Sequence, residues 1–168
     1  MLHARELIPP GTSASADGTL TLTFEDRRRS RLLAKLDDGR EIALLLPRGT
    51  LLREGDRVRA DEEGLTFVVR AAAESLSIGR TSDPLALTVA AYHIGNRHVP
   101  LQIGSGWLAY AHDHVLDDLV RGLGLEVETR VAPFEPEPGA FRHETTGRAE
   151  QGPITHQHRN GGSHHHHP

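Results

Sequence analysis

Histidine is the residue type of this chain whose distribution points most directly to chemistry. The chain has 12 histidines among 168 residues, and they are concentrated near its end. The tail histidines are His143, His156, His158, His164, His165, His166 and His167. Neutral imidazole suits Ni(II), Cu(II) and Zn(II), and a flexible run can wrap around an ion without a preformed cage. The tail therefore predicts divalent-metal binding, although the ending GGSHHHHP also resembles a purification tag.

Two more histidines, His112 and His114, flank Asp113 where a predicted strand meets a predicted helix. In an extended strand, residues i and i+2 point the same way, so both imidazoles could reach one ion, whereas in a helix they diverge. A helix that begins near Asp113 instead makes this aspartate an N-cap. It also buries His112 partly and places His114 on a polar face with Asp117 and Asp118. The spacing leaves both interpretations open.

His93 and His98 bracket the pair Gly95-Asn96, which is predicted to supply the left-handed residue that ends a helix. A histidine in the last helical turn is often a partner for the helix dipole, and this is the prediction for His93. His98 lies past the helix end, on a loop. There it could meet its own copy across a two-fold axis, because such an interface places equal residues opposite each other.

Several classes of function are excluded or disfavoured by composition and motifs. The chain has no cysteine, which excludes thiolate metal sites and cysteine nucleophiles and makes the cytoplasm the expected location. The nearest metallohydrolase pattern, HxHxDH, fails because Leu116 and Asp117 stand where Asp and His are needed. No GxSxG, P-loop or GxGxxG motif occurs, so no catalytic residue and no cofactor-binding residue are predicted.

Charge and hydropathy argue against two further partners. The net charge of −4 disfavours nucleic acid, and no apolar run approaches the roughly 18 to 20 residues that span a membrane. The whole deficit lies in residues 74–168, with 7 basic and 11 acidic residues, which would favour a cation. The basic cluster of Arg27, Arg28, Arg29 and Arg31 is predicted to be a solvated strand edge or turn.

The first 72 residues have the pattern of a small β barrel or sandwich. Short stretches rich in Leu, Val and Thr alternate with turns such as DDGR and DEEG, which is typical of antiparallel strands. The predicted strands are Leu20 to Phe24, Leu32 to Leu36, Ile42 to Leu46, Val58 to Ala60 and Leu65 to Ala71. Residues 1–72 are therefore predicted to form one β-rich domain.

Residues 73–141 have a different texture, in which strands and helices mix. A strand at Ser75 to Gly79 precedes a helix that begins at Asp83-Pro84, and a hairpin and a second helix ending at Gly124 follow. A last strand, Leu125 to Val131, completes the order βαββαβ, so the fold class is α+β with a ferredoxin-like second domain. From Pro133 onward the chain is predicted to be disordered, and residues 142–168 to form a flexible tail.

Three segments resemble one known family. AYHIGNRHVPLQI, LAYAHDHVLDDLVRGLGLEV and APFEPEPGAF resemble the UreE family of urease accessory proteins, and RGTLLREGDRVRADEEG with VVRAAAE resembles that family's first domain. The similarity covers about residues 1–141. It implies that residues 1–72 form a β-rich domain of the partner- or peptide-binding kind and that residues 73–141 bind metal and form the dimer. It also implies a nickel metallochaperone that forms a homodimer and delivers Ni(II) to urease apoprotein together with the other accessory proteins, including a GTPase.

The resemblance also implies roles for individual histidines. His98 matches the histidine through which each subunit contributes to a nickel site at the dimer interface. His112 and His114 match histidines that form additional peripheral sites in some members. The tail histidines match a His-rich C-terminus that supplies further ligands. The alternative prediction is a cytosolic protein that buffers or stores Zn(II), Cu(II) or Ni(II), because imidazoles alone bind Cu(II) more tightly than Ni(II).

Overall fold

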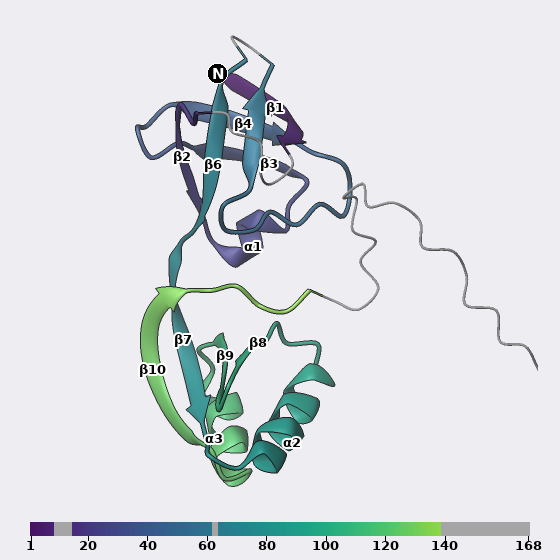
Figure 1. Ribbon diagram of the computed structural model, residues 1–168, viewed down its shortest axis with the longest axis vertical. Helices are drawn as coiled ribbons and strands as arrows, with labels where there is room; N and C mark the ends of the chain where they lie inside the picture. The colour runs from purple at the N-terminus through teal and green to yellow at the C-terminus, as the bar shows by residue number, and fades with distance from the viewer. Residues whose placement is uncertain (9–14, 62–63, 139–168) are drawn as a thin grey trace, which may run out of the picture.

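The computed structural model describes residues 1–8, 15–61 and 64–138, and these form two units, each built on one β-sheet (Figure 1). The first sheet has six strands in the order β2-β6-β5-β1-β4-β3. Its elements are β1 Leu2–Ile8, β2 Gly18–Leu22, α1 Phe24–Arg27, β3 Arg31–Lys35, β4 Glu41–Leu45, β5 Arg57–Ala60 and β6 Thr66–Ala71. The apolar core of this unit includes Leu20, Ile42, Leu44, Val58, Phe67 and Val69, all fully buried.

Asp37 joins the two edges of this first sheet. Its backbone N–H donates to the Thr19 carbonyl at 3.0 Å, and its carboxylate accepts from Thr19 Oγ1 at 2.5 Å and from the Thr21 N–H at 3.1 Å. The bond from Thr19 contributes most to lowering the pKa of Asp37. Since Thr19 and Thr21 lie on edge strand β2 and Asp37 follows edge strand β3, the sheet is nearly closed. Of the predicted barrel or sandwich, the structure thus has a barrel-like sheet. The prediction of antiparallel strands is wrong for two pairs, because β1 pairs with β4 and β2 pairs with β6 in parallel.

The second sheet has four antiparallel strands in the order β10-β7-β9-β8. Its elements are β7 Ala73–Arg80, α2 Pro84–Gly95, β8 Gln102–Gly104, β9 Trp107–Ala111, α3 His114–Gly122 and β10 Glu126–Pro133. Leu108 and Tyr110 alternate on one face of β9 and pack with Ile94 of α2 and Val120 of α3, so both helices cover that face. The βαββαβ order and the α+β fold class are confirmed.

The helix starts of this unit follow the sequence signals closely. Asp83 caps α2 by accepting from the Leu85 N–H at 2.9 Å, and Pro84 opens the helix. None of the helices in the described ranges is long and apolar enough to cross a bilayer.

Two elements of the first unit differ from the prediction. The strand β1 was not predicted, because a bulge between Ala4 and Glu6 breaks the alternation on which sequence patterns depend. The strand β2 ends before Phe24, because Thr23 instead caps the short helix α1 by accepting from the Asp26 N–H at 3.2 Å.

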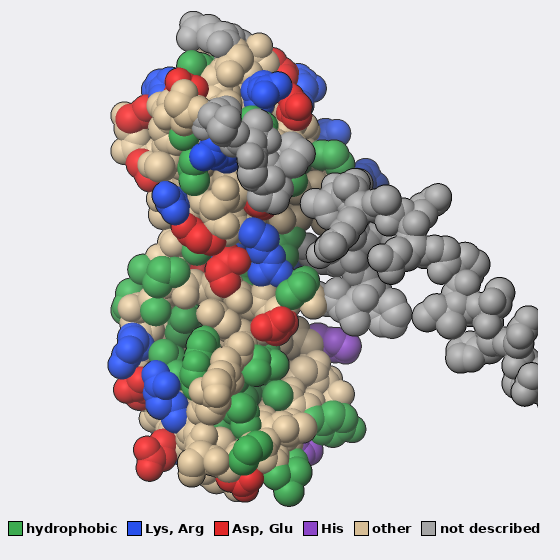
Figure 2. Space-filling view, viewed as in Figure 1, with side chains coloured by type: hydrophobic (Ala, Val, Ile, Leu, Met, Phe, Trp, Pro, Cys, Tyr) green, Lys and Arg blue, Asp and Glu red, His purple; other side chains and the backbone are tan. Residues whose placement is uncertain are grey.

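The basic cluster agrees with the prediction of a solvated strand edge or turn except at Arg27, since Arg28, Arg29 and Arg31 are exposed and Arg31 lies on edge strand β3. Arg27 is fully buried, while Arg28 and Arg29 are exposed and lie 3.3 and 3.6 Å from carboxylates of α1. Figure 2 shows blue and red side chains interspersed over the upper unit, which is the N-terminal one. The cluster is therefore divided between one buried residue and a locally neutralised surface.

The prediction of disorder from Pro133 onward is wrong for residues 133–138. Pro133 ends β10, and residues 134–138, here named the strap, run back from the second unit to the first (Figure 1). Phe134 is 2% exposed and packs edge-on against Phe24 with ring centroids 5.5 Å apart. The polar composition of the segment hides this anchor. Residues 139–168 lie outside the described residues.

Candidate metal centre

His98 is held in an unusual backbone conformation just after α2. Its φ is +58°, and its N–H donates to the Gly95 carbonyl at 2.9 Å. Asn96 has φ −64°, so the prediction that Gly95-Asn96 supplies the left-handed residue is wrong, and His98 supplies it. Histidine is one of the few residues other than glycine enriched there, although a cost remains. The conformation places an exposed imidazole at the turn between α2 and β8.

His98 borders a groove of about 470 Å³ between the two units. The groove is lined by Phe24, Arg28 and Leu51 of the first unit, by Ala91, Gly95, Val99, Pro100, Leu101 and Ile103 of the second, and by Glu137 and Pro138 of the strap. The strap is the last described part of the chain before the tail. Pro138, the last described residue before the tail, consequently borders the same groove as His98.

His112 takes part in a polar network that spans β7, β9 and α3. Its Nδ1 lies 2.9 Å from Ser77 Oγ and 3.4 Å from Asp117 Oδ2, and the Tyr110 hydroxyl donates to Asp117 Oδ1 at 2.9 Å. The prediction that Asp117 lies on a polar face is wrong, because this side chain is 4% exposed. When Nδ1 carries the proton, it can donate to Ser77 Oγ beside the Asp117 carboxylate, and Nε2 is left for a metal.

The network also affects ionisation at its buried end. Burial, followed by the hydrogen bond and negative charge of Asp117, raises the pKa of Tyr110. The tyrosine therefore stays protonated and remains a donor to the carboxylate.

We expect Tyr110→Phe to lower the free energy of unfolding by about 1–3 kcal/mol, because it leaves the buried Asp117 carboxylate without its donor. Urea denaturation followed by circular dichroism measures this. Tyr92→Phe is a matched control, since Tyr92 is 64% exposed and should change stability little. An equal effect of the two substitutions would contradict the expectation.

His114 is the first residue of α3, and Asp113 is its N-cap. The Asp113 carboxylate accepts from the N–H groups of Val115 and Leu116 at 2.8 and 3.1 Å. The bond from Leu116, then that from Val115, lowers the pKa of Asp113. The helix N-terminus predicted as one interpretation of HDH is thus present, and metal binding by His112 and His114 stays a prediction.

No ready-made metal cage is present in the part of the chain that the structure describes. Within residues 1–8, 15–61 and 64–138, no three or more His, Cys, Asp or Glu side chains are grouped so that they could hold an ion. A metal ion at His98 would therefore require further ligands from outside the described residues or from a second copy of the chain. The predicted ligands His143, His156, His158, His164, His165, His166 and His167 lie outside the described residues.

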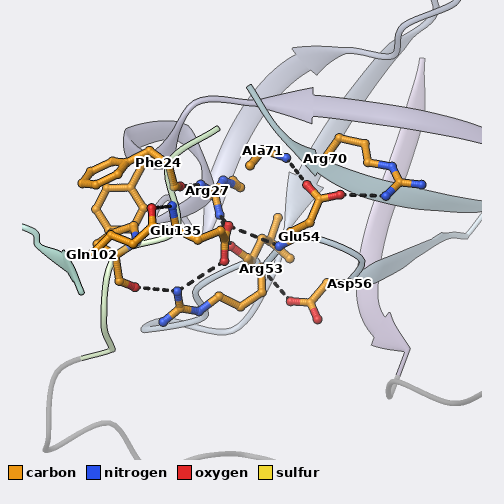
Figure 3. A network of polar contacts seen from close by, with 12 residues as sticks. Phe24, Arg27, Arg53, Glu54, Asp56, Arg70, Ala71, Gln102 and Glu135 are labelled. Carbon is orange, nitrogen blue, oxygen red and sulfur yellow. Dashed lines mark hydrogen bonds and ion pairs between the residues drawn. The ribbon is translucent and has the colours of Figure 1, made fainter. Parts of the chain in front are cut away.

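The joint between the two units contains residues that the sequence pattern did not single out (Figure 3). Arg27 of α1 donates to the Phe134 carbonyl and to the Glu135 carboxylate of the strap. Arg53 donates to the Pro136 carbonyl at 2.7 Å. The only sequence signals were arginines at two places in the first unit and the phenylalanine and glutamates of PFEPEPG.

Two other carboxylates of the joint, Asp56 and Glu54, have pKa values shifted from the ordinary ones. Burial raises the pKa of Asp56, and the negative charge of Glu135 adds to this effect. Burial also opposes ionisation of Glu54, but hydrogen bonds from Arg70 and the Ala71 N–H outweigh it and lower the pKa of Glu54.

Comparison with known proteins gives a consistent result over nearly the whole chain. Residues 2–72 match the family described as UreE urease accessory protein, N-terminal domain, and residues 69–167 match the one described as its C-terminal domain. The urease accessory protein UreE of Alkalilimnicola ehrlichii is 57% identical over 141 residues, covering 84% of this chain and 85% of that protein. The proteins of that name from Pseudomonas putida F1 and Proteus mirabilis are 54% and 52% identical, over 83% and 73% of this chain and 83% and 76% of their own lengths.

Proposed function

The chain belongs to the UreE family of urease accessory proteins, which gives it a role in urease maturation, and from that premise we propose that it binds Ni(II) and delivers it. The ion is cargo that the protein carries in the cytoplasm and hands to urease apoprotein and its maturation partners, including the GTPase. The observation that carries the proposal is His98, an exposed imidazole beside the groove where the tail begins.

The nickel site is proposed to form between two copies of the chain. One imidazole cannot hold Ni(II) usefully, but two-fold symmetry supplies a second His98 without any new residue, and tail histidines or water complete the coordination. Exposed apolar side chains near His98 support a self-association surface. Tyr92 of α2 is 64% exposed and Ile103 of β8, which borders the same groove, is 43% exposed.

Delivery requires that the ion leave again. The structure gives the His98 side chain no hydrogen-bond partner within residues 1–8, 15–61 and 64–138, so its ring is not fixed by a second ligand shell there. Such rings give weaker and more exchangeable coordination than oriented ones. His112, whose Nδ1 lies 2.9 Å from Ser77 Oγ, and His114 are proposed as secondary sites, and Zn(II) and Cu(II) are expected to compete in vitro.

Complementation separates this function from metal buffering. A ureolytic strain that lacks its own protein of this kind is expected to regain urease activity in low nickel when it expresses this chain. Added nickel should reduce the difference in urease activity between the strains with and without the chain. Urease activity is measured per amount of urease protein, together with total cell nickel. If the chain raises nickel tolerance but leaves the activity per urease unchanged, it is a buffer and the proposal fails.

A further inference from the structure

Arg27 is a buried cation whose charged partner lies outside the first unit. Its side chain is 0% exposed. Within the described part of the first unit its guanidinium donates to the Leu52 carbonyl at 3.3 Å and lies 5.7 Å from the centroid of the Phe24 ring. Burying a guanidinium is unfavourable unless it is paired and hydrogen-bonded, and an apolar side chain often serves packing as well. The pairing comes from the strap, more than 100 residues away in sequence, through the Phe134 carbonyl and Glu135.

The first unit holds the strap at further points. Arg53 donates to the Pro136 carbonyl at 2.7 Å and lies 3.4 Å from the Glu135 carboxylate. The Glu54 N–H donates to Glu135 Oε1 at 3.3 Å. Glu135 is therefore shared by two arginines and a backbone amide.

The second unit holds the same segment from the other side. The Glu135 N–H donates to Gln102 Oε1 at 3.0 Å, and the Glu137 N–H donates to the Leu101 carbonyl at 2.8 Å. Gln102 opens β8 and Leu101 borders the groove. The strap is thus bound to both units just before the tail begins.

This anchoring sets how far the tail histidines start from His98. Pro138 borders the same groove as His98, and His143 follows five residues later. Five residues span at most about 17 Å when fully extended. His143 is therefore within chain reach of the groove whenever the strap is bound.

We propose that Arg27 is a positioning residue for the tail: by binding the strap it fixes the point at which the tail leaves the fold, beside His98. The inference rests on the proposed nickel function. If the strap is released, the tether to His143 starts at Pro133 and doubles from five residues to ten. Effective concentration falls roughly as the −3/2 power of tether length, so nickel affinity should fall about threefold.

A double comparison in the full-length chain tests this. Arg27→Met keeps the length and removes the charge, and Arg53→Gln loosens the strap from a less buried position. Each substitution is made in the otherwise unchanged chain and in a chain whose seven tail histidines are replaced by Gln. The Ni(II) affinity of every variant is measured by competition with a chelator. We expect about a threefold loss in the presence of the tail histidines and no change without them.

Arg29→Gln is the matched control, because Arg29 lies two residues after Arg27 but is exposed and pairs with Asp26 instead of the strap. Hydrogen exchange of the Glu135 and Glu137 amides reports strap release without metal. We expect these amides to exchange faster in Arg27→Met and Arg53→Gln than in the unsubstituted chain, and to exchange at an unchanged rate in Arg29→Gln. Three results would overturn the inference. The first is faster amide exchange with unchanged Ni(II) affinity, and the second is unchanged amide exchange. The third is an equal loss of Ni(II) affinity in the chain without tail histidines. Absence of nickel binding by the unsubstituted chain would instead overturn the proposed function, while the exchange result stands.

Discussion

His98→Asn is expected to remove the tightest nickel site and leave the fold unchanged. The side chain is exposed, so the substitution takes little apolar packing away. Asparagine tolerates the left-handed φ of +58° that this position requires, whereas alanine would add backbone strain to the loss of the ligand. The backbone turn between α2 and β8 should therefore persist.

The affinity loss should be large, because a site shared by two subunits loses both imidazoles at once. Changes outside the first ligand shell already cost about 10–100-fold in metal affinity, so the loss here should exceed about 100-fold. Isothermal titration with Ni(II) measures it, and thermal unfolding checks the fold.

His93→Gln provides the control for this substitution. His93 lies in the last turn of α2, stacks edge-on with Tyr92 and does not border the groove. Its replacement should leave the high-affinity phase unchanged. An unchanged high-affinity phase in His98→Asn would instead show that His98 is not the principal ligand.

The parts of the fold that the sequence predicted well depend on short-range rules. Asp83-Pro84 and Asp113 mark helix starts because a capping side chain accepts from amides two or three residues away. The βαββαβ order follows from such local signals taken in series. Helix starts and fold class could thus be predicted from neighbouring residues.

The features that were missed depend on partners distant in sequence. Nothing near Arg27 shows that it is buried, because its partners Phe134 and Glu135 lie more than 100 residues later. Asp117 was assigned to a polar face because its partner Tyr110 belongs to a neighbouring strand. The polar strap was taken as disordered for the same reason, since its contacts come from two other parts of the chain.

The sequence predicted which residues form the site but not how they are arranged in space. Histidine type, spacing and resemblance selected His98, but its left-handed backbone and its groove follow from how α2 ends and how the units meet. The tail could be recognised by composition alone. Its starting point beside His98 could not, because that depends on the strap.

Ending the chain after Arg142 is expected to lower the number of nickel ions bound and to leave one ion per dimer. The truncation removes all seven tail histidines but leaves the strap and both copies of His98. Two imidazoles and water can still hold one ion at the two-fold axis. The remaining site should be about tenfold weaker or more, because the tail no longer contributes ligands or outer-shell support.

Dimerisation should survive this truncation, because the apolar side chains proposed for the dimer surface lie on the second unit and not in the polar tail. Leu85, Tyr92 and Ile103 are 70%, 64% and 43% exposed and lie on α2 and β8. Sedimentation velocity at several nickel concentrations gives the oligomeric state, and native mass spectrometry counts the ions.

A full-length chain with His164, His165, His166 and His167 replaced by Ser is the control for this truncation. It separates the terminal run from His143, His156 and His158, which it retains. If the terminal run only stores metal, this variant should bind fewer ions but keep the full affinity of the His98 site. A truncated protein that binds one ion per subunit, or that is a metal-bound monomer, would show that His98 does not bridge subunits, since a shared ligand pair requires half an ion per chain.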